Sequence, residues 1–216
     1  MSYLAEYKKE DFKQVSWEDY GKTLEVLFNK VEKYLKENKI KIDAVVPILR
    51  GGAFPGTYLA FRLNLLRILP VQYKYFFEDG KLMLKKILPL PKANLPEKPV
   101  FLLVEQNHCF GITAQTATND LLAEFPKCRI IYAADHMDYS YQKMEGAEAV
   151  FYGKLTNETR KLSKEECREK GIFHLSYLFP WESLEEEWVT VQGKQFKYSD
   201  LEKTEKEAET KKVIEL

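Results

Sequence analysis

Two short polar loops carry the residues whose types and spacing suit phosphate chemistry. In the first, Arg50 precedes Gly51 and Gly52, directly after an apolar run at 42–49. An arginine offers paired donors to phosphate oxygens, and glycines allow the backbone to approach a ligand closely. Taken alone, this loop fits a surface arginine at a glycine turn slightly better than a ligand site.

The second loop follows the apolar run 100–105 and contains Gly111 and Thr113. Gly111 permits a tight turn, and Thr113 is suited to cap the helix expected after it. Backbone N–H groups at the start of a helix, together with the helix dipole, favour a phosphate. An ordinary strand-to-helix connection with a threonine N-cap explains the same residues, and without further context it is the favoured interpretation.

Two other groupings of reactive side chains are weaker signals. His108 and Cys109 are sequence neighbours, but a Cys–His nucleophile is defined by distance in space. A metal site built from His108, Cys109, His136 and Asp138 would require neighbouring strand ends to converge, and their spacing matches no standard zinc pattern. We therefore expect neither a cysteine nucleophile nor a zinc site.

The elements that position these loops alternate between helix and strand. Ser16 and Asp19 have capping-box spacing, and apolar residues then recur at helical spacing, which predicts a helix to about Asn38. Apolar runs at 42–49, 100–105 and 128–135 predict strands covered on both faces.

Two more helices and a hairpin complete the pattern. One helix is expected through Leu59, Leu63 and Leu66, and another from Thr113 to Phe125. Strand-like segments at 69–77 and 81–88 flank Asp79-Gly80, a hairpin turn signal. The segment 148–153 predicts a further strand.

This order predicts an α/β fold, with a mainly parallel twisted sheet and helices on both faces. Ligands of such sheets bind beyond the carboxyl ends of the strands, where both polar loops are expected. The predicted α/β domain spans residues 1–188, and a hairpin with a charged C-terminal extension is expected over 189–216.

Composition limits the partners. Lys+Arg and Asp+Glu are both 33, so the net charge is zero and gives no reason to expect binding to nucleic acid or to an anionic membrane. The three scattered cysteines favour a reducing, cytoplasmic environment. The charged N-terminus lacks the apolar core of a signal peptide, and no apolar run is long enough to span a membrane.

Three motifs resemble those of the type I phosphoribosyltransferases, most closely the xanthine-guanine and hypoxanthine-guanine group. VVPILRGGAFPGTYLAFRL at 45–63 resembles that group's pyrophosphate loop and following helix. FLLVEQNHCFGITA at 101–114 is in register with its phosphoribosyl-pyrophosphate signature, and FPWE at 179–182 resembles the segment after its purine site. The resemblance implies phosphoribosyl transfer to a purine, Mg²⁺ as cofactor, and a homo-oligomer.

The resemblance also implies roles by position. The pyrophosphate would be bound by Arg50, Gly51 and Gly52. The catalytic positions are Glu105, Gln106 and Cys109, with Glu105 also the magnesium ligand. The 5′-phosphate would be bound by Phe110, Gly111, Ile112, Thr113 and Ala114. The purine would contact Asp135, Tyr177 and Phe179.

Several of these positions depart from the family's pattern, and the departures fall on the chemistry. Gln106 and Cys109 stand where the family has acids, Phe110 replaces a small hydroxyl residue, Ile112 replaces a glycine, and Asp135 stands where a lysine reads the purine's exocyclic oxygen. Each hydrogen-bonding group that is missing and not replaced weakens ligand binding by about 1–3 kcal/mol.

Two functions from different classes are therefore expected. The first is an inefficient purine phosphoribosyltransferase acting on phosphoribosyl pyrophosphate. The second is a catalytically degenerate protein that binds a nucleoside monophosphate or a sugar phosphate in a regulatory role.

Overall fold

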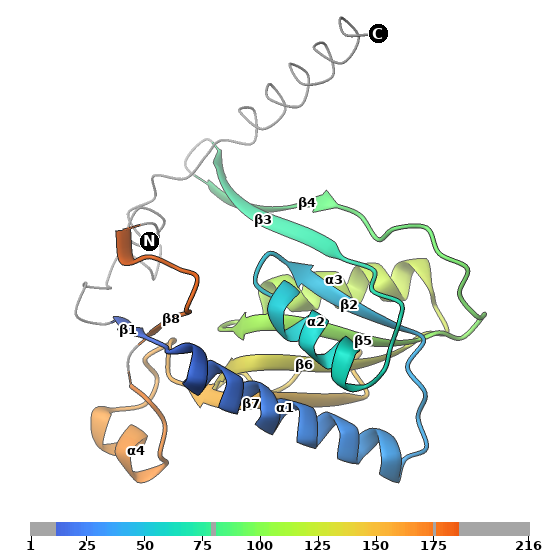
Figure 1. Ribbon diagram of the computed structural model, residues 1–216. Helices are drawn as coiled ribbons and strands as arrows, with labels where there is room; N and C mark the ends of the chain where they lie inside the picture. The colour runs from blue at the N-terminus through green and yellow to red at the C-terminus, as the bar shows by residue number, and fades with distance from the viewer. Residues whose placement is uncertain (1–11, 79–80, 175, 186–216) are drawn as a thin grey trace, which may run out of the picture.

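The computed structural model describes residues 12–78, 81–174 and 176–185 (Figure 1). The helices are α1 (Trp17–Glu37), α2 (Ala53–Arg62), α3 (Ile112–Glu124) and α4 (Lys164–Glu169). The strands are β1 (Phe12–Gln14), β2 (Ala44–Leu49), β3 (Val71–Glu78), β4 (Lys81–Leu88), β5 (Val100–His108), β6 (Arg129–Asp138), β7 (Ala149–Thr156) and β8 (Ser176–Leu178).

The main sheet has six strands in the order β4-β3-β2-β5-β6-β7. All neighbours pair in parallel except β3 and β4, which form an antiparallel hairpin. The predicted mainly parallel α/β fold is confirmed. The predicted extension at 189–216 lies outside the described residues.

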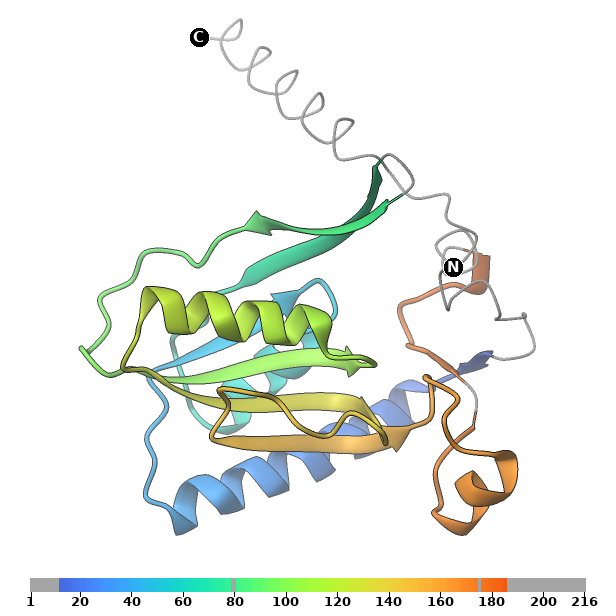
Figure 2. The same ribbon diagram turned by 180° about the vertical axis from the view of Figure 1, so that it is seen from behind.

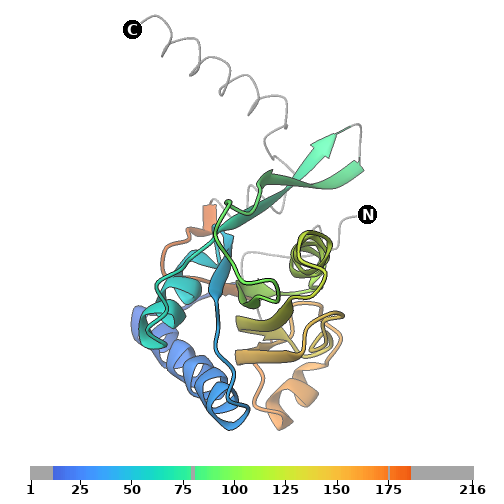
Figure 3. The ribbon, with the colours of Figure 1, turned by 90° about the vertical axis from the view of Figure 1, so that its right-hand side faces the viewer.

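Helices cover both faces of this sheet. Figure 1 shows α1 and α2 in front of the sheet, Figure 2 shows α3 in front of the opposite face, and Figure 3 shows the sheet between them. Strand β5 explains why: Leu102 and Val104 pack in the core beneath α1 and α2, whereas Phe101 and Leu103 pack beneath α3. A strand buried on both faces requires an unbroken apolar run.

The chain reverses direction across the sheet between β2 and β5. The connection through α2 leads from β2 outward to β3, whereas the connection through α3 leads from β5 the other way to β6. This is a topological switch point, and in open α/β sheets ligands bind in the crevice at the carboxyl ends of its strands.

Local signals fix the ends of the helices. The Ser16 side chain accepts from the backbone N–H of Asp19 at 3.1 Å and caps α1 as predicted. Helix α2 ends at Arg62, and Asn64 has a positive φ of 55°. The predicted continuation through Leu66 is therefore wrong, and the Leu66 side chain is 97% exposed.

Two strands run further than predicted. Strand β5 continues past Glu105 to His108 and β6 continues past Asp135 to Asp138, because parallel pairing persists through Asn107↔His136 and His108↔Met137. Polar residues that were expected in open loops thus lie within the sheet.

A small second layer lies at the carboxyl edge of the sheet. Strands β1 and β8 pair in parallel there, and α4 is next to them (Figure 1). Helix α4 begins with a capping box formed by Ser163 and Glu166. No helix in the described ranges is long and apolar enough to cross a bilayer.

Candidate functional site

The Arg50-Gly51-Gly52 loop lies directly against β5. The peptide between Leu49 and Arg50 is cis, and the Arg50 side chain is exposed just past the end of β2. A Cβ on Gly51 would lie 2.2 Å from Oε1 of Gln106, and one on Gly52 would lie 2.4 Å from the carbonyl oxygen of Val104. Neither position has room for a side chain, so both glycines are needed for this close approach.

The second loop leads into α3 through a left-handed glycine. Gly111 has φ 73° and is the N-cap of α3, so the predicted cap at Thr113 is wrong. No side chain caps this end of α3. A Cβ on Gly111 would lie 2.5 Å from Nε2 of His108, so this turn also packs too closely for a side chain. The first-turn N–H groups point out at the switch point, where the helix dipole favours an anion.

The buried His108 ring packs against this turn. Its Nδ1 lies 2.9 Å from the hydroxyl of Tyr132 on β6. Burial lowers the pKa of His108 to about 4, so the ring is neutral at pH 7. His108 is therefore a packing residue for the loop.

Glu105 is half-buried on β5 and lies near Tyr75 of β3. Burial raises the pKa of Glu105 to about 8, and the negative charge of Asp135 adds to the shift. Burial also raises the pKa of Tyr75, while a hydrogen bond with the Thr113 side chain opposes that shift. Glu105 of β5, Thr113 at the start of α3 and Tyr75 of the β3–β4 hairpin are therefore close together.

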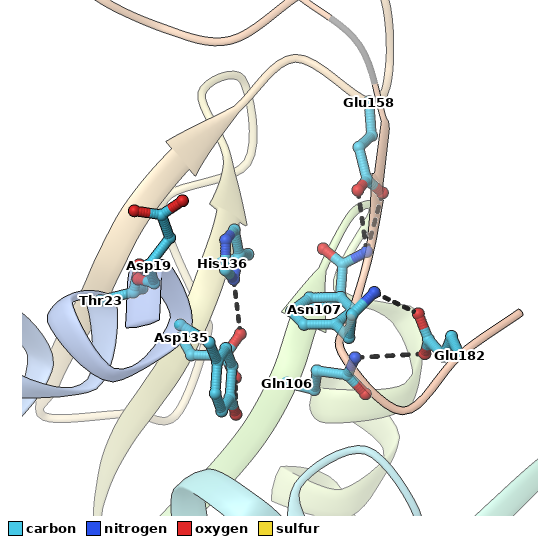
Figure 4. A network of polar contacts seen from close by, with 10 residues as sticks. Asp19, Thr23, Gln106, Asn107, Asp135, His136, Glu158 and Glu182 are labelled. Carbon is cyan, nitrogen blue, oxygen red and sulfur yellow. Dashed lines mark hydrogen bonds and ion pairs between the residues drawn. The ribbon is translucent and has the colours of Figure 1, made fainter. Parts of the chain in front are cut away.

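Gln106 connects the sheet to residues 176–182, which we call the C-terminal segment. Its side chain is only 7% exposed, and its Nε2 donates to Oε1 of Glu182 at 3.3 Å (Figure 4). The other Glu182 oxygen accepts from the backbone N–H of Phe179 at 2.8 Å. Burial raises the pKa of Glu182, and the nearby Arg50 charge opposes this. The second acid position is thus occupied by an amide that is already engaged within the protein.

Asn107 and Glu158 form a second link of the same kind. Asn107 Nδ2 donates to both carboxylate oxygens of Glu158, at 3.0 and 2.9 Å (Figure 4). Burial raises the pKa of Glu158 to about 7. Two neighbouring residues of β5 therefore each bond to a carboxyl group from a distant part of the chain.

The three purine-contact positions of the resemblance meet around His136. The His136 ring lies 4.9 Å from the rings of both Tyr177 and Phe179. Its Nδ1 is 2.8 Å from Oδ1 of Asp135, whose other oxygen accepts from the Tyr20 hydroxyl at 2.6 Å. Asp135 is 0% exposed and lies within β6, three residues before its end. Asp135 was expected at the end of its strand, and this is wrong, because β6 continues to Asp138.

Cys109 and Phe110 lie between β5 and the Gly111 turn, and both are half-buried. The Phe110 ring packs edge-on against Tyr141, with centroids 5.2 Å apart. Ile112 is exposed and Ala114 is buried under the first turn of α3. The residues of the predicted 5′-phosphate loop are thus adjacent in space, with the two bulky side chains, Phe110 and Ile112, on either side of Gly111.

The described residues do not supply a metal-binding set. No group of three or more His, Cys, Asp or Glu side chains among them is arranged to hold an ion. His136 contacts Asp135, and Asp138 accepts from the backbone N–H groups of Ser140 and Thr159. Glu105 is the one carboxyl group at the predicted magnesium position, and its raised pKa leaves it largely protonated at pH 7. Because Mg²⁺ prefers charged carboxylates, these donors do not fit a protein-held magnesium ion.

Solved structures resemble this fold closely in length and topology. A purine phosphoribosyltransferase from Pyrococcus horikoshii is 17% identical with TM-score 0.58, covering 80% of this chain and 95% of its own. A xanthine-guanine-hypoxanthine phosphoribosyltransferase from Helicobacter pylori is 18% identical with TM-score 0.57, covering 83% and 99%. A hypothetical protein from Neisseria gonorrhoeae with bound ppGpp is 18% identical with TM-score 0.59, covering 85% and 97%.

No protein-family model and no curated protein matches the sequence. The identities to the solved structures are low, so they define the fold and not the activity. The chain has the fold of the type I phosphoribosyltransferases.

Sequence reasoning missed four residues at this edge of the sheet: Tyr75, Asn107, Glu158 and Glu182. The sequence does point to Glu182, since this residue ends the FPWE motif. No sequence pattern points to Glu158 or Tyr75, because their positions depend on how β7 and the hairpin pack against the strand ends. Asn107 was predicted to be a loop residue, because β5 was expected to end at Glu105.

Proposed function

We propose that this protein binds a phosphorylated ribose ligand, either phosphoribosyl pyrophosphate or a purine nucleoside 5′-monophosphate, across the switch point between β2 and β5. One observation carries the proposal. The Arg50 loop packs against β5, and the uncapped start of α3 follows the same strand. An exposed arginine and a free helix start on neighbouring strand ends suit a ligand with an anionic group at each end.

In this proposal Arg50 and the backbone of Gly51 and Gly52 hold the pyrophosphate, and the N–H groups after Gly111 hold the 5′-phosphate. Glu105, largely protonated, exchanges hydrogen bonds with a ribose hydroxyl. Tyr177 and Phe179 lie on the purine side.

Phosphoribosyl transfer to a purine is the reaction that the fold and the two loops favour. Transfer of this kind depends on positioning and on stabilising charge that develops at the sugar and at the leaving pyrophosphate. The chain offers Arg50 for the leaving group but only one carboxyl group, Glu105, for the sugar. We propose slow transfer for this reason.

A non-catalytic nucleotide-binding role is the second candidate. Its specific support is Gln106, whose amide is bonded to Glu182 and pressed against Gly51. The similar N. gonorrhoeae protein carries bound ppGpp, which supports nucleotide binding by this fold.

Magnesium has no protein-held place in this proposal, because the donors around Glu105 do not fit it. We also propose a cytoplasmic protein, since the three cysteines are free thiols. A homo-oligomer remains part of the proposal.

Isothermal titration calorimetry with phosphoribosyl pyrophosphate, AMP, GMP and IMP tests the binding. We expect at least one ligand to bind, and Arg50→Ala to weaken the binding of phosphoribosyl pyrophosphate at least tenfold. Arg67→Ala is the matched control, because Arg67 is also exposed but is next to Asp43 at the other end of β2. The control should stay within twofold of the parent.

Release of pyrophosphate from phosphoribosyl pyrophosphate with a panel of purines then separates the two candidates. Turnover supports the transferase, and binding without turnover supports the nucleotide-binding role. Failure of folded protein to bind all four ligands would refute both.

A further inference from the structure

The orientation of the Asn107 side chain is fixed by its partner. Carboxylate oxygens only accept hydrogen bonds, so the Asn107 group that faces both Glu158 oxygens must be the NH₂. The amide oxygen of Asn107 therefore points the other way. Figure 4 shows it turned toward the side where His136 lies, and Asn107 and His136 are register partners on β5 and β6.

This oxygen is buried and has no donor. Among the described residues, two buried side-chain polar atoms lack a hydrogen-bond partner, Asn107 Oδ1 and Thr156 Oγ1. Leaving a buried acceptor unpaired costs free energy that any correctly placed N–H group would recover. The Asn107 oxygen is also on the strand that carries the proposed phosphate loop.

Aromatic rings lie on the same side as the Asn107 oxygen. His136, the register partner of Asn107, has its ring centroid 4.9 Å from those of Tyr177 and Phe179. Asn107 is four residues before Gly111, at most about 13 Å along an extended chain. A nucleotide with its phosphate at Gly111 therefore brings its base to this end of β5.

We propose that Asn107 is a specificity-determining residue that accepts a hydrogen bond from an exocyclic amino group of a purine nucleotide. This inference rests on the proposed function, since it places the nucleotide's phosphate at the Gly111 loop. The chain then selects one of the aminopurine nucleotides, AMP or GMP, over IMP, whose base donor N1–H lies at a different position from an exocyclic amino group. A site with a fixed acceptor discriminates against a ligand that cannot place a donor there.

The Asn107 oxygen is covered in this arrangement, so binding requires the side chains around it to move. Glu158, which bonds to Asn107, also accepts from the Tyr177 backbone N–H, so a ligand that bonds to Asn107 also affects this contact.

Calorimetric titration of the full chain with AMP, GMP and IMP tests the inference. We expect AMP or GMP to bind at least tenfold more tightly than IMP. Asn107→Leu keeps the branched shape of the side chain but removes the acceptor, so it should reduce that preference to within twofold. Thr156→Val is the matched control, because it removes the other unpartnered buried oxygen and leaves Asn107 and its Glu158 partner in place, so the preference should persist.

The outcomes separate this inference from the proposed function. Equal affinity for all three nucleotides, a preference for IMP, or a preference that survives in folded Asn107→Leu would overturn the inference and leave the proposed function standing. Absence of binding by all three, together with phosphoribosyl pyrophosphate, would instead refute the proposed function and the inference with it. Melting temperatures of both variants establish that they are folded.

Discussion

Individual residues at the strand ends are kept in unusual ionisation states by burial. The pKa of Glu105 is raised to about 8, and the pKa of His108 is lowered to about 4, so both groups are mostly neutral at pH 7. Each shift has the same cause, since removal from water disfavours the charged form of either group. A site for an anionic ligand gains from this, because a neutral Glu105 does not repel phosphate.

Glu105→Gln should change how stability depends on pH. A carboxyl group whose pKa is higher in the folded state destabilises the fold as it ionises, so stability falls as pH rises from about 4.5 towards 8. The variant should match the parent near pH 4 and exceed it by about 2 kcal/mol at pH 8.5, a figure reduced for the partial exposure of Glu105.

Urea unfolding at both pH values measures this difference. Glu169→Gln, at an exposed glutamate of α4, is the control and should show no pH-dependent gain. An equal effect of Glu105→Gln at both pH values would show that the Glu105 carboxyl group does not change its ionisation in this range.

Tyr20→Phe should destabilise the protein by about 1–3 kcal/mol, because buried Asp135 loses a hydroxyl donor. Tyr34→Phe removes a hydroxyl that bonds to exposed Glu148 and should cost less than about 0.5 kcal/mol. Urea unfolding measures both free energies. Similar unfolding midpoints for the two variants would contradict a structural role for the Tyr20–Asp135 bond.

At the scale of elements, β5 is the strand that contacts every part of the candidate site. Its apolar first half is covered by helices on both faces, and its polar second half contacts the Arg50 loop, the C-terminal segment and the Gly111 turn. Gln106 joins two of these, since it lies against Gly51 and bonds to Glu182. Gln106 was predicted to lie in the loop after residues 100–105, and this is wrong, because β5 continues to His108.

Gln106→Glu should loosen the link between β5 and the C-terminal segment, because two carboxylates would face each other in a buried site. We expect a loss of about 2 kcal/mol at pH 7.5 and a smaller loss at pH 5, where protonation relieves the repulsion. Gln106→Met is the matched variant, losing only the hydrogen bond, at about 1 kcal/mol. Thermal unfolding at both pH values checks this, and a pH-independent loss for Gln106→Glu would contradict it.

At the scale of the whole molecule, two large apolar side chains are exposed at the end of α2 and just after it. Phe61 is 86% exposed and Leu66 is 97% exposed, and exposed apolar groups of this size often mark contacts between proteins. They lie away from the strand ends that form the candidate site, so a second chain bound there would leave the site open.

We therefore predict that the protein forms a homo-oligomer and that Phe61→Ser with Leu66→Ser shifts it toward monomer. Light scattering after size-exclusion chromatography measures the mass. Substitution of exposed Met83 on β4 with serine is the control and should leave the mass unchanged. A parent protein that is monomeric at high concentration would refute the prediction.

The sequence by itself determined the layers of the fold and which two loops follow the central strands. Unbroken apolar runs at β2, β5 and β6 require strands covered on both faces, and the two glycine loops follow two of these strands. Local chemistry is enough for such features, because hydrophobic periodicity and capping residues act over a few neighbouring positions.

Only the tertiary structure decided which polar residues meet there. The contacts Gln106–Glu182, Asn107–Glu158 and Tyr20–Asp135 join residues 76, 51 and 115 positions apart. Alternation along β6 also changes after Ala134, since Ala134 and Met137 both pack in the core beneath α3 although they are three residues apart. No local pattern specifies such contacts, because they form only when the packed sheet brings the strand ends and the C-terminal segment together.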